Sequence, residues 1–397
     1  MQKRIFNSVG SNYTYRFAID ALFARGTGAT EKLTEYLNKR YNGKTTLFYK
    51  GREAITYALL SCGLPEQSKV AICAYTCAVV PTAVKNAKLV PLYVDIDSNH
   101  LDFSFEAFKK AYENDSTIRA VIIQNTLGFT QSITEIEAFC KEKGIFLIED
   151  LAHSAGATYP CGRETGTVGD FTILSFSQDK IVDAISGGAL VTRTSKAHSV
   201  QIDWRVIPKK EQRRDRLYPI RTCKIRSLYS VFGIGKLLHF ILKKRKALSL
   251  PVYALDNKIE QLPSWYAELA LHRFHTLDTD IARRRKIAEK YLEAFPALVH
   301  TCMTKESILR ATCVRIPLLV DDRATMIACL QKKGIHISDI WYDVPVSPLR
   351  YWHLFKDENK AGEALRVSEK MINLPTHMTL SDADVQRIIC TVNTCKN

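Results

Sequence analysis

One stretch, residues 144–191, constrains the fold of this chain more than any other. Its first apolar run, 145–148, stops abruptly at two acids, Glu149 and Asp150, and two further apolar runs follow it. A buried strand that ends on an acid is typical of an α/β protein, in which ligands bind beyond the carboxyl ends of parallel strands. The stretch therefore predicts a ligand site at one edge of a mostly parallel sheet.

A strand-ending acid and a single lysine beyond the next strand form a candidate pair for pyridoxal phosphate (PLP) chemistry. That chemistry requires a lysine, here Lys180, to form a Schiff base with the aldehyde. It also requires a carboxylate, here Asp150, to keep the pyridinium nitrogen protonated so that the ring accepts electrons. Because the two residues lie at different strand ends, they can converge on one ring. The ordinary alternative, a helix-capping aspartate and a surface lysine, is more frequent for an arbitrary pair of this kind.

The surrounding residues favour the cofactor chemistry. The chain reads E-D-L-A-H-S-A-G-A from Glu149, then G-x-x-G-D-F, then S-F-S-x-x-K from Ser175, then G-G-A. This order resembles the DegT/DnrJ/StrS family of sugar aminotransferases in the aspartate aminotransferase (fold-type I) superfamily. The resemblance covers about three quarters of the chain and is interrupted mainly at 205–260. It implies PLP as the cofactor, and a three-layer, doubly covered α/β sheet with a small C-terminal α/β domain.

The same resemblance implies the site residues, with Lys180 and Asp150 as the catalytic pair and no metal. The cofactor-binding residues that it implies are Gly51, Arg52, Glu53, Cys77, Asp150, His153, Ser175 and Lys180. Ser175 matches the phosphate-binding serine of the family, and His153 is expected against the cofactor ring or on its 3-hydroxyl. A glycine that opens a helix suits a phosphate, and Arg52, where the family has a hydroxyl residue, adds charge. The alternative is that Arg52 pairs with Glu53 or with solvent.

Two positions depart from the family pattern. Cys77 stands where the family has the aromatic residue that stacks on the cofactor ring, so Tyr75 or His153 is expected to cover the ring instead. The segment 258–265 lacks the asparagine that in the family reaches the phosphate of the partner subunit. The intersubunit phosphate contact is therefore in doubt from the sequence.

Strands alternate with helices of ten or so residues over 45–195, which predicts a mostly parallel sheet covered on both faces. With 397 residues, the chain is long enough for more than one domain. We expect a large PLP-binding domain at 1–260, and a connecting helix with a small domain at 261–397. The helical pattern at 265–295 reads as one long helix.

The positive charge is concentrated in one segment. Residues 205–246 hold 14 lysines and arginines against two acids, a net charge of +12 that leaves +3 for the other 355 residues. Within it, 225–246 combines apolar residues with a terminal K-K-R-K cluster, which favours a helix lying in an anionic membrane surface. The alternative is a helix packed on the protein itself. Nucleic acid is the less favoured partner, because no recognised nucleic-acid-binding fold accompanies the segment.

The resemblance implies an aminotransferase that moves an amino group, typically from glutamate, to a keto-sugar nucleotide in glycan biosynthesis, working as a homodimer. Two competing hypotheses remain: another fold-type I reaction, such as a lyase or decarboxylase, and a noncatalytic relative that binds membranes or nucleic acid. Eleven scattered cysteines without a C-x-x-C pair, and an amino terminus without a secretory signal, favour reduced thiols and a cytoplasmic enzyme. The alternative within this location is a protein peripheral on the cytoplasmic face of the membrane.

Overall fold

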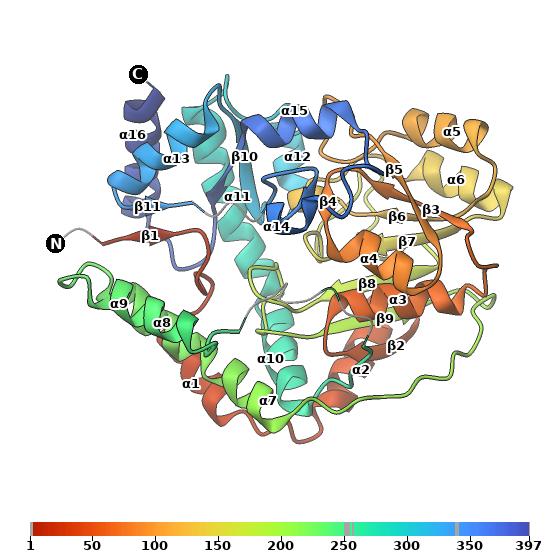
Figure 1. Ribbon diagram of the computed structural model, residues 1–397, viewed down its shortest axis with the longest axis horizontal. Coiled ribbons are helices and arrows are strands. Elements are labelled where there is room, and N and C mark those ends of the chain that lie inside the picture. Colours follow the sequence, from red (N-terminus) through yellow and green to blue (C-terminus); the bar gives the residue numbers. More distant parts are fainter. Residues whose placement is uncertain (1–2, 250–254, 256–257, 338–340, 397) are drawn as a thin grey trace.

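A seven-stranded sheet forms the centre of the molecule in the computed structural model, which describes residues 3–249, 255, 258–337 and 341–396 (Figure 1). Its strand order is β2-β9-β8-β7-β6-β3-β5. The strands are β2 (Lys44–Phe48), β3 (Lys69–Cys73), β5 (Val90–Val94), β6 (Ile118–Ile123), β7 (Phe146–Asp150), β8 (Phe171–Ser175) and β9 (Gly188–Thr192). β9 runs antiparallel to both of its neighbours, and the other adjacent pairs are parallel. The predicted mostly parallel sheet is confirmed.

Helices cover both faces of this sheet because the strand side chains alternate. Val70 and Ile72 of β3 belong to the apolar cluster under α3 (Gly51–Ser61) and α4 (Val79–Asn86). Ala71 and Cys73 belong to the cluster on the opposite face, with side chains of α2 (Ala29–Tyr41), α5 (Phe105–Asn114), α6 (Thr134–Lys143) and α10 (Ser264–His275). Buried on both faces, these strands read as continuous apolar runs in the sequence. The expected three-layer architecture is confirmed.

The C-terminal part of the chain forms a smaller unit beside the sheet (Figure 1). β10 (Arg315–Leu319) pairs antiparallel with β13 (Met371–Pro375), and α12 (Lys305–Arg310), α13 (Arg323–Lys332), α15 (Gly362–Lys370) and α16 (Asp382–Lys396) surround them. The first strand of the chain, β1 (Ile5–Phe6), pairs parallel with β11 (Ile335–His336) of this unit. Residues 5–6 therefore lie with the C-terminal part, while the domain division at 260 stays a prediction.

The single long helix expected at 265–295 is instead two helices. α10 ends at His275 and α11 (Leu277–Ala294) begins two residues later. Thr276, with φ −102° and ψ 0°, lies between them and is the C-cap of α10 and the N-cap of α11. The apolar pattern continues through this residue because α10 and α11 both pack against the same core.

The basic segment folds as three helices: α7 (Lys209–Arg216), α8 (Tyr218–Leu228) and α9 (Ile234–Lys244). The single helix expected at 225–246 is wrong, because the chain reverses between α8 and α9, where Gly233 has a φ of +75°. α8 lies against α1 (Tyr15–Phe23), and α9 projects with the hairpin away from the sheet (Figure 1). The part of the insertion at 250–254 and 256–257 lies outside the described residues.

Several charges of this segment hold the fold together. Arg226 donates to the Tyr13 carbonyl at 2.6 Å, and Arg216 donates to the Ala24 carbonyl at 2.9 Å. The buried Asp215 accepts hydrogen bonds from the hydroxyls of Tyr49 and Tyr266 at 2.6 and 2.8 Å. Part of the positive excess therefore serves the N-terminal segment by satisfying its carbonyl groups.

The expectation of reduced thiols throughout is wrong at one pair. Cys329 on α13 and Cys395 on α16 form a disulfide, with Cα atoms 5.9 Å apart. These two helices pack against each other, which brings together two cysteines 66 positions apart in the sequence. The other nine cysteines are free thiols.

Glu149, at the end of β7, fixes the loop before β8. Its fully buried carboxylate accepts hydrogen bonds from the backbone N–H groups of Gly166, Val168 and Gly169 at 2.6 to 2.8 Å. It also accepts the Tyr159 hydroxyl at 2.9 Å. The G-x-x-G-D-F motif is thus a backbone cradle for one carboxylate, which ties the start of β8 to the end of β7.

We predict that Glu149→Ala lowers the free energy of unfolding by about 3–5 kcal/mol, because it leaves several buried donors without an acceptor. Urea unfolding followed by circular dichroism measures this loss. Glu289→Ala, at an exposed position of α11, is the matched control and changes stability by less than about 0.5 kcal/mol. A loss for Glu149→Ala as small as that of the control would contradict this role.

Candidate active site

A cavity opens at the carboxyl ends of the parallel strands, below the smaller unit. It is lined by Gly51, Arg52, Cys77, Gln124, Asp150, His153, Ser175, Lys180, Trp341 and Tyr342, among others. The residues expected from the sequence come from the start of α3, from β4 (Thr76–Cys77), from the ends of β7 and β8, and from the loops after these two strands. Seven of the eight predicted cofactor-binding residues therefore face one space.

Glu53 is the exception. Its side chain is buried outside the cavity lining, and its carboxylate accepts a hydrogen bond from the Glu260 backbone N–H at 3.0 Å. Successive side chains of a helix point about 100° apart, so Arg52 and Glu53 cannot both face the cavity. Burial raises the pKa of Glu53 to about 8, and its place in the structure is a link between α3 and the segment before α10.

Lys180 lines the cavity, and its side chain is partly buried. Burial lowers the pKa of its ammonium group, and the nearby Asp150 carboxylate partly opposes this shift. Its Nζ is 3.1 Å from Nε2 of His153. A lysine with a lowered pKa supplies the neutral amine that a carbonyl carbon requires of its nucleophile.

The hydrogen bonds of His153 determine which of its nitrogens carries the proton. Nδ1 accepts the Leu127 backbone N–H at 3.2 Å, and burial lowers the imidazole pKa well below its usual value. The ring is therefore neutral with its proton on Nε2, facing the Lys180 nitrogen. His153 thus donates toward Lys180 and favours the neutral form of that amine.

Asp150 is the acid of the cavity. One of its oxygens accepts the Ala152 backbone N–H at 2.9 Å, which fixes the carboxylate at the end of β7. Burial raises its pKa, and the positive charge of Lys180 lowers it in part. A buried carboxylate without a close ion pair binds a protonated ring nitrogen strongly, because the two opposite charges meet in a low dielectric.

A close approach of three chain segments shapes the end of the cavity at α3. A Cβ added to Gly188 would lie 2.6 Å from the Gly51 nitrogen, and one added to Gly51 would lie 2.9 Å from the Ser175 Cβ. The N-terminus of α3 has no side-chain cap, and its first two residues, Gly51 and Arg52, line the cavity beside Ser175. Backbone N–H groups at a helix N-terminus, next to a hydroxyl and Arg52, form a phosphate-binding arrangement.

Trp341 and Tyr342 of the cavity were missed from the sequence. The Lys180 Nζ lies 4.5 Å from the centre of the Trp341 ring, and the Arg315 guanidinium lies 4.3 Å from the same ring. The His153 ring packs against Trp341, with 4.5 Å between centroids. Both aromatics follow the small-domain strand β11, some 160 positions after Lys180, and a W-Y pair in a loop carries no local signal of a site.

Tyr75, one of the two residues expected to cover the cofactor ring, does not line the cavity. Its hydroxyl donates to the Tyr342 carbonyl at 3.3 Å, and its side chain is fully buried. His153, the other candidate, does line the cavity. Cys77 also lines it, and its backbone pairs with Ser347 of β12 (Val346–Ser347).

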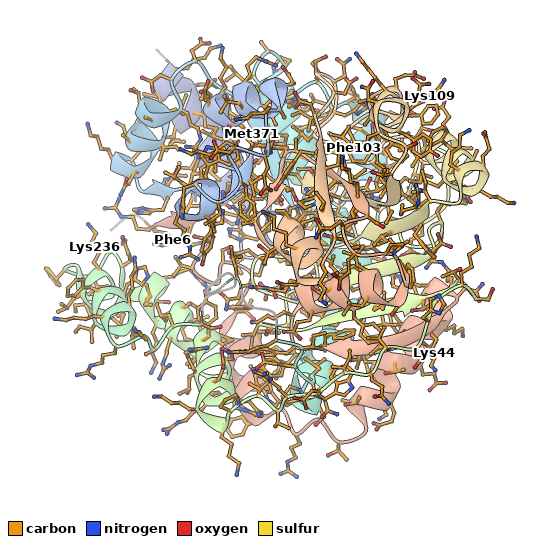
Figure 2. The ribbon with its side chains drawn as sticks, turned by 45° about the vertical axis from the view of Figure 1, so that its right-hand side comes forward. Phe6, Lys44, Phe103, Lys109, Lys236 and Met371 are labelled. Carbon is orange, nitrogen blue, oxygen red and sulfur yellow. A yellow bond between two sulfur atoms is a disulfide. The ribbon has the colours of Figure 1, made fainter. Side chains whose placement is uncertain are left out.

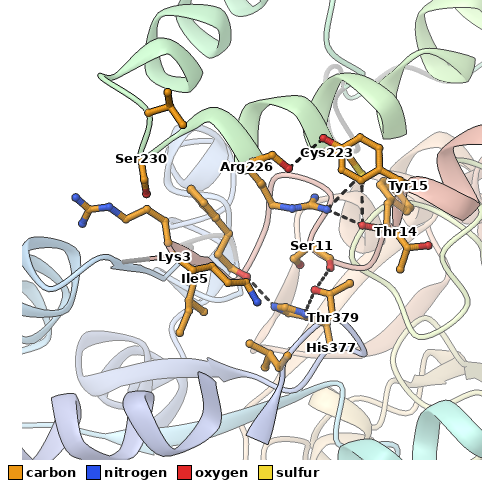
Figure 3. Close-up of a pocket in the computed structure, with 16 residues that line it drawn as sticks. Lys3, Ile5, Ser11, Thr14, Tyr15, Cys223, Arg226, Ser230, His377 and Thr379 are labelled. Atoms are coloured by element: carbon orange, nitrogen blue, oxygen red, sulfur yellow. Dashed lines mark hydrogen bonds between the residues drawn. The ribbon is translucent and has the colours of Figure 1, made fainter. Parts of the chain in front are cut away.

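A larger cavity of about 650 Å³ lies elsewhere, between the N-terminal segment, α8 and residues 377–380 (Figure 3). Arg226 and His377 reach its wall from opposite sides. Arg226 donates to backbone carbonyls there, and His377 Nε2 donates to the Phe6 carbonyl at 2.8 Å. None of the predicted site residues lines this cavity. The chemistry therefore belongs to the smaller cavity at Lys180.

Comparison with known proteins agrees with this geometry. Residues 30–393 match the DegT/DnrJ/EryC1/StrS aminotransferase family. The chain belongs to this family. A GDP-perosamine synthase of Caulobacter vibrioides is 23% identical over 350 residues, which cover 86% of this chain and 83% of that protein. Protein MosB of Rhizobium meliloti is 33% identical over 143 residues, but these span 36% of this chain and 28% of that protein.

A solved structure supports the fold. An E. coli GDP-4-keto-6-deoxy-D-mannose-3-dehydratase with bound hydrated PLP superimposes with a TM-score of 0.68 at 17% identity, covering 99% of each chain. The expected PLP-dependent fold type I is thus confirmed. The residues present fit PLP, because a partly buried amine, a buried acid and a helix N-terminus without a side-chain cap line one cavity.

The close contact between Gly188 and Gly51 predicts how one added methyl group at position 188 changes PLP binding. Gly188→Ala forces the new Cβ against the Gly51 nitrogen and displaces the N-terminus of α3. We expect it to weaken PLP binding by about 10- to 100-fold, the equivalent of an overpacking cost of about 1–3 kcal/mol. Titration of the cofactor-free protein with PLP, followed by absorbance, measures the affinity.

Gly362→Ala is the matched control, because a Cβ there meets open space and leaves the affinity unchanged. Equal affinities of the two variants would show that α3 does not bind the cofactor.

Proposed function

We propose that this aminotransferase transfers an amino group from an amino-acid donor, glutamate in the first instance, to a keto-sugar nucleotide used in glycan biosynthesis. The observation that carries the proposal is the convergence of Lys180 and Asp150 on one cavity. The likeness to GDP-perosamine synthases over most of the chain supports the choice of acceptor. Bound PLP supplies an electron sink and carries the amino group between the two substrates.

Lys180 is proposed as the residue that binds the cofactor and then moves a proton. Burial lowers the pKa of the Lys180 ammonium group, which favours the neutral amine that a nucleophile and a general base require. The His153 Nε2–H at 3.1 Å orients the nitrogen lone pair. Trp341 lies on another side of the amine and limits its contact with water.

Asp150 is proposed as the acid that keeps the pyridine nitrogen protonated. This role is supported by its burial and by the Ala152 N–H, which anchors one of its oxygens. The phosphate group is proposed to bind at Gly51, Arg52 and Ser175, beside the N-terminus of α3. His153 and Trp341 are proposed to pack beside the ring where other family members use an aromatic in place of Cys77.

We predict that glutamate abolishes the near-visible absorption of the lysine-bound cofactor and yields 2-oxoglutarate. In Lys180→Ala this half-reaction slows by roughly a thousandfold or more, because no other residue replaces the proton transfer. Lys236→Ala, at an exposed lysine of α9, is the control and keeps the wild-type rate.

Each remaining outcome has a distinct meaning. An absorption band that does not respond to glutamate, or to other amino donors, would assign the cavity to another fold-type I reaction such as a lyase or decarboxylase. The absence of any band with added PLP would contradict the enzyme altogether and favour a noncatalytic relative.

We also propose that the enzyme is a cytoplasmic homodimer. Nine of the eleven cysteines are free thiols, as is usual in a reducing compartment. The exposed side chains Ile19 and Phe23 on α1 supply apolar surface for a subunit contact.

Sedimentation equilibrium tests the dimer. We expect twice the chain mass for the wild type, and a largely monomeric Phe23→Asp variant, because a charge would be buried unpaired in the contact. Leu309→Asp, a similarly exposed apolar position, is the control and stays dimeric. A wild-type monomer would contradict the proposal.

A further inference from the structure

The helix α9 exposes a set of large apolar side chains. Leu237 and Phe240 are 60% and 64% exposed, and Phe232, in the turn before the helix, is 90% exposed. Ile234 and Ile241 are also exposed. Ile234, Leu237 and Ile241 follow the spacing i, i+3, i+7, so they form one stripe along the helix.

The opposite side of α9 already has its packing partner. α8 and α9 pack along their length, and a Cβ on Gly235 would lie 2.4 Å from the Ile225 carbonyl oxygen. Leu238 and Leu242 on the inner side are partly buried. The outer stripe is therefore additional to the apolar face that α9 needs in order to fold against the protein.

Positive charge surrounds this stripe without any acid. Lys236, Lys243, Lys244, Arg245 and Lys246 are all exposed, and the sequence has no Asp or Glu between Asp215 and Asp256. Figure 2 shows Lys236 on the projecting hairpin, away from the sheet. Unlike Arg216 and Arg226, which donate to backbone carbonyls, these five side chains face solvent.

We propose that α9 docks this aminotransferase onto an anionic lipid surface, with Phe232, Leu237 and Phe240 entering the boundary between headgroups and acyl chains. An apolar stripe bordered by lysines has the pattern of a helix that lies in a membrane interface. The basic residues complement anionic headgroups, and each is expected to raise the membrane partition coefficient about fivefold, or by about 1 kcal/mol. Pairing with a second copy of the same face is disfavoured, because a two-fold contact would bring ten cations together without an acid.

The length of α9 decides how it meets the membrane. Its 11 residues extend about 16 Å, half the thickness of a hydrocarbon core. Among the described residues, no helix has the length and apolar character needed to cross a bilayer. The hairpin therefore lies on the surface, and the substrate cavity stays on the aqueous side.

Vesicle flotation of the full-length, PLP-loaded protein tests the proposal. We expect the wild type to float with vesicles that contain phosphatidylglycerol, and far less with phosphatidylcholine alone or at high salt. The variant Phe232→Ser/Leu237→Ser/Phe240→Ser should lose at least tenfold in partition coefficient. A second variant, with Lys243, Lys244, Arg245 and Lys246 each replaced by glutamine, should lose a similar factor on anionic vesicles.

The matched control replaces three exposed apolar residues elsewhere, Leu309→Ser/Leu349→Ser/Leu354→Ser, and should float like the wild type. Glutamate turnover and circular dichroism check that each variant is folded. If the wild type does not float, or if the apolar variant floats equally, the proposal is overturned. A wild type that ignores vesicles but binds a DNA duplex, with the apolar variant binding equally, would assign the charges to nucleic acid and also overturn it.

Discussion

A single buried carboxylate, Asp183, holds the loop that carries Lys180. It accepts the Asp179 and Ile185 backbone N–H groups at 2.8 and 3.1 Å, so the loop closes around it. The Asn12 amide and the Tyr13 hydroxyl, from the far N-terminal segment, donate to the same carboxylate at 3.0 and 2.5 Å. The loop fixes the Cα from which the long, flexible Lys180 side chain starts, and it therefore limits where the nitrogen can lie. The reactive amine is thus oriented by residues that do not touch the cavity at Lys180.

The two acids at the end of β7 have different roles, one structural and one chemical, because the strand directs their side chains to opposite faces. Successive side chains of a strand point to opposite faces, so Glu149 and Asp150 cannot share an environment. Glu149 meets the backbone cradle of the next loop, and Asp150 faces the cavity. A shift of one residue in the register of β7 would exchange the two faces and lose both functions. The E-D pair therefore meets two requirements: Glu149 anchors the loop before β8, and Asp150 supplies the acid of the site.

Local patterns made much of this architecture predictable from the sequence. The alternation of strands and helices expected over 45–195 is confirmed, since apolar runs and glycine turns lie within short windows of the sequence. The site residues that lie at strand ends, such as Asp150 and Lys180, were predictable for the same reason. The errors involve long-range contacts. Trp341 reaches the cavity from the smaller C-terminal unit, and the Cys329–Cys395 bond joins two helices that are far apart in the sequence. The turn between α8 and α9 folds these two helices against each other.

Glu53 illustrates a different limit of sequence comparison. It lies beside two residues that do line the cavity, yet the rotation of the helix turns it toward the backbone of Glu260. A motif of consecutive residues does not show which of their side chains point to the same side of a helix. The direction follows once the first helical residue, Gly51, is known.

The pairing of β1 with β11 has a consequence for how the protein is made. Asn7 donates to the Asn373 carbonyl at 2.6 Å, and the Phe6 carbonyl accepts from His377, so the first strand is bonded to residues more than 360 positions later. On the ribosome, at about 5–20 residues per second, the beginning of the chain waits roughly twenty seconds to a minute for these partners. The Asn12 and Tyr13 contacts with Asp183 form with earlier-made residues and can hold the waiting segment in place. Completion of the fold is therefore a late event, and a nascent chain that has already assembled the Lys180 loop still exposes an unpaired strand to its neighbours on the polysome.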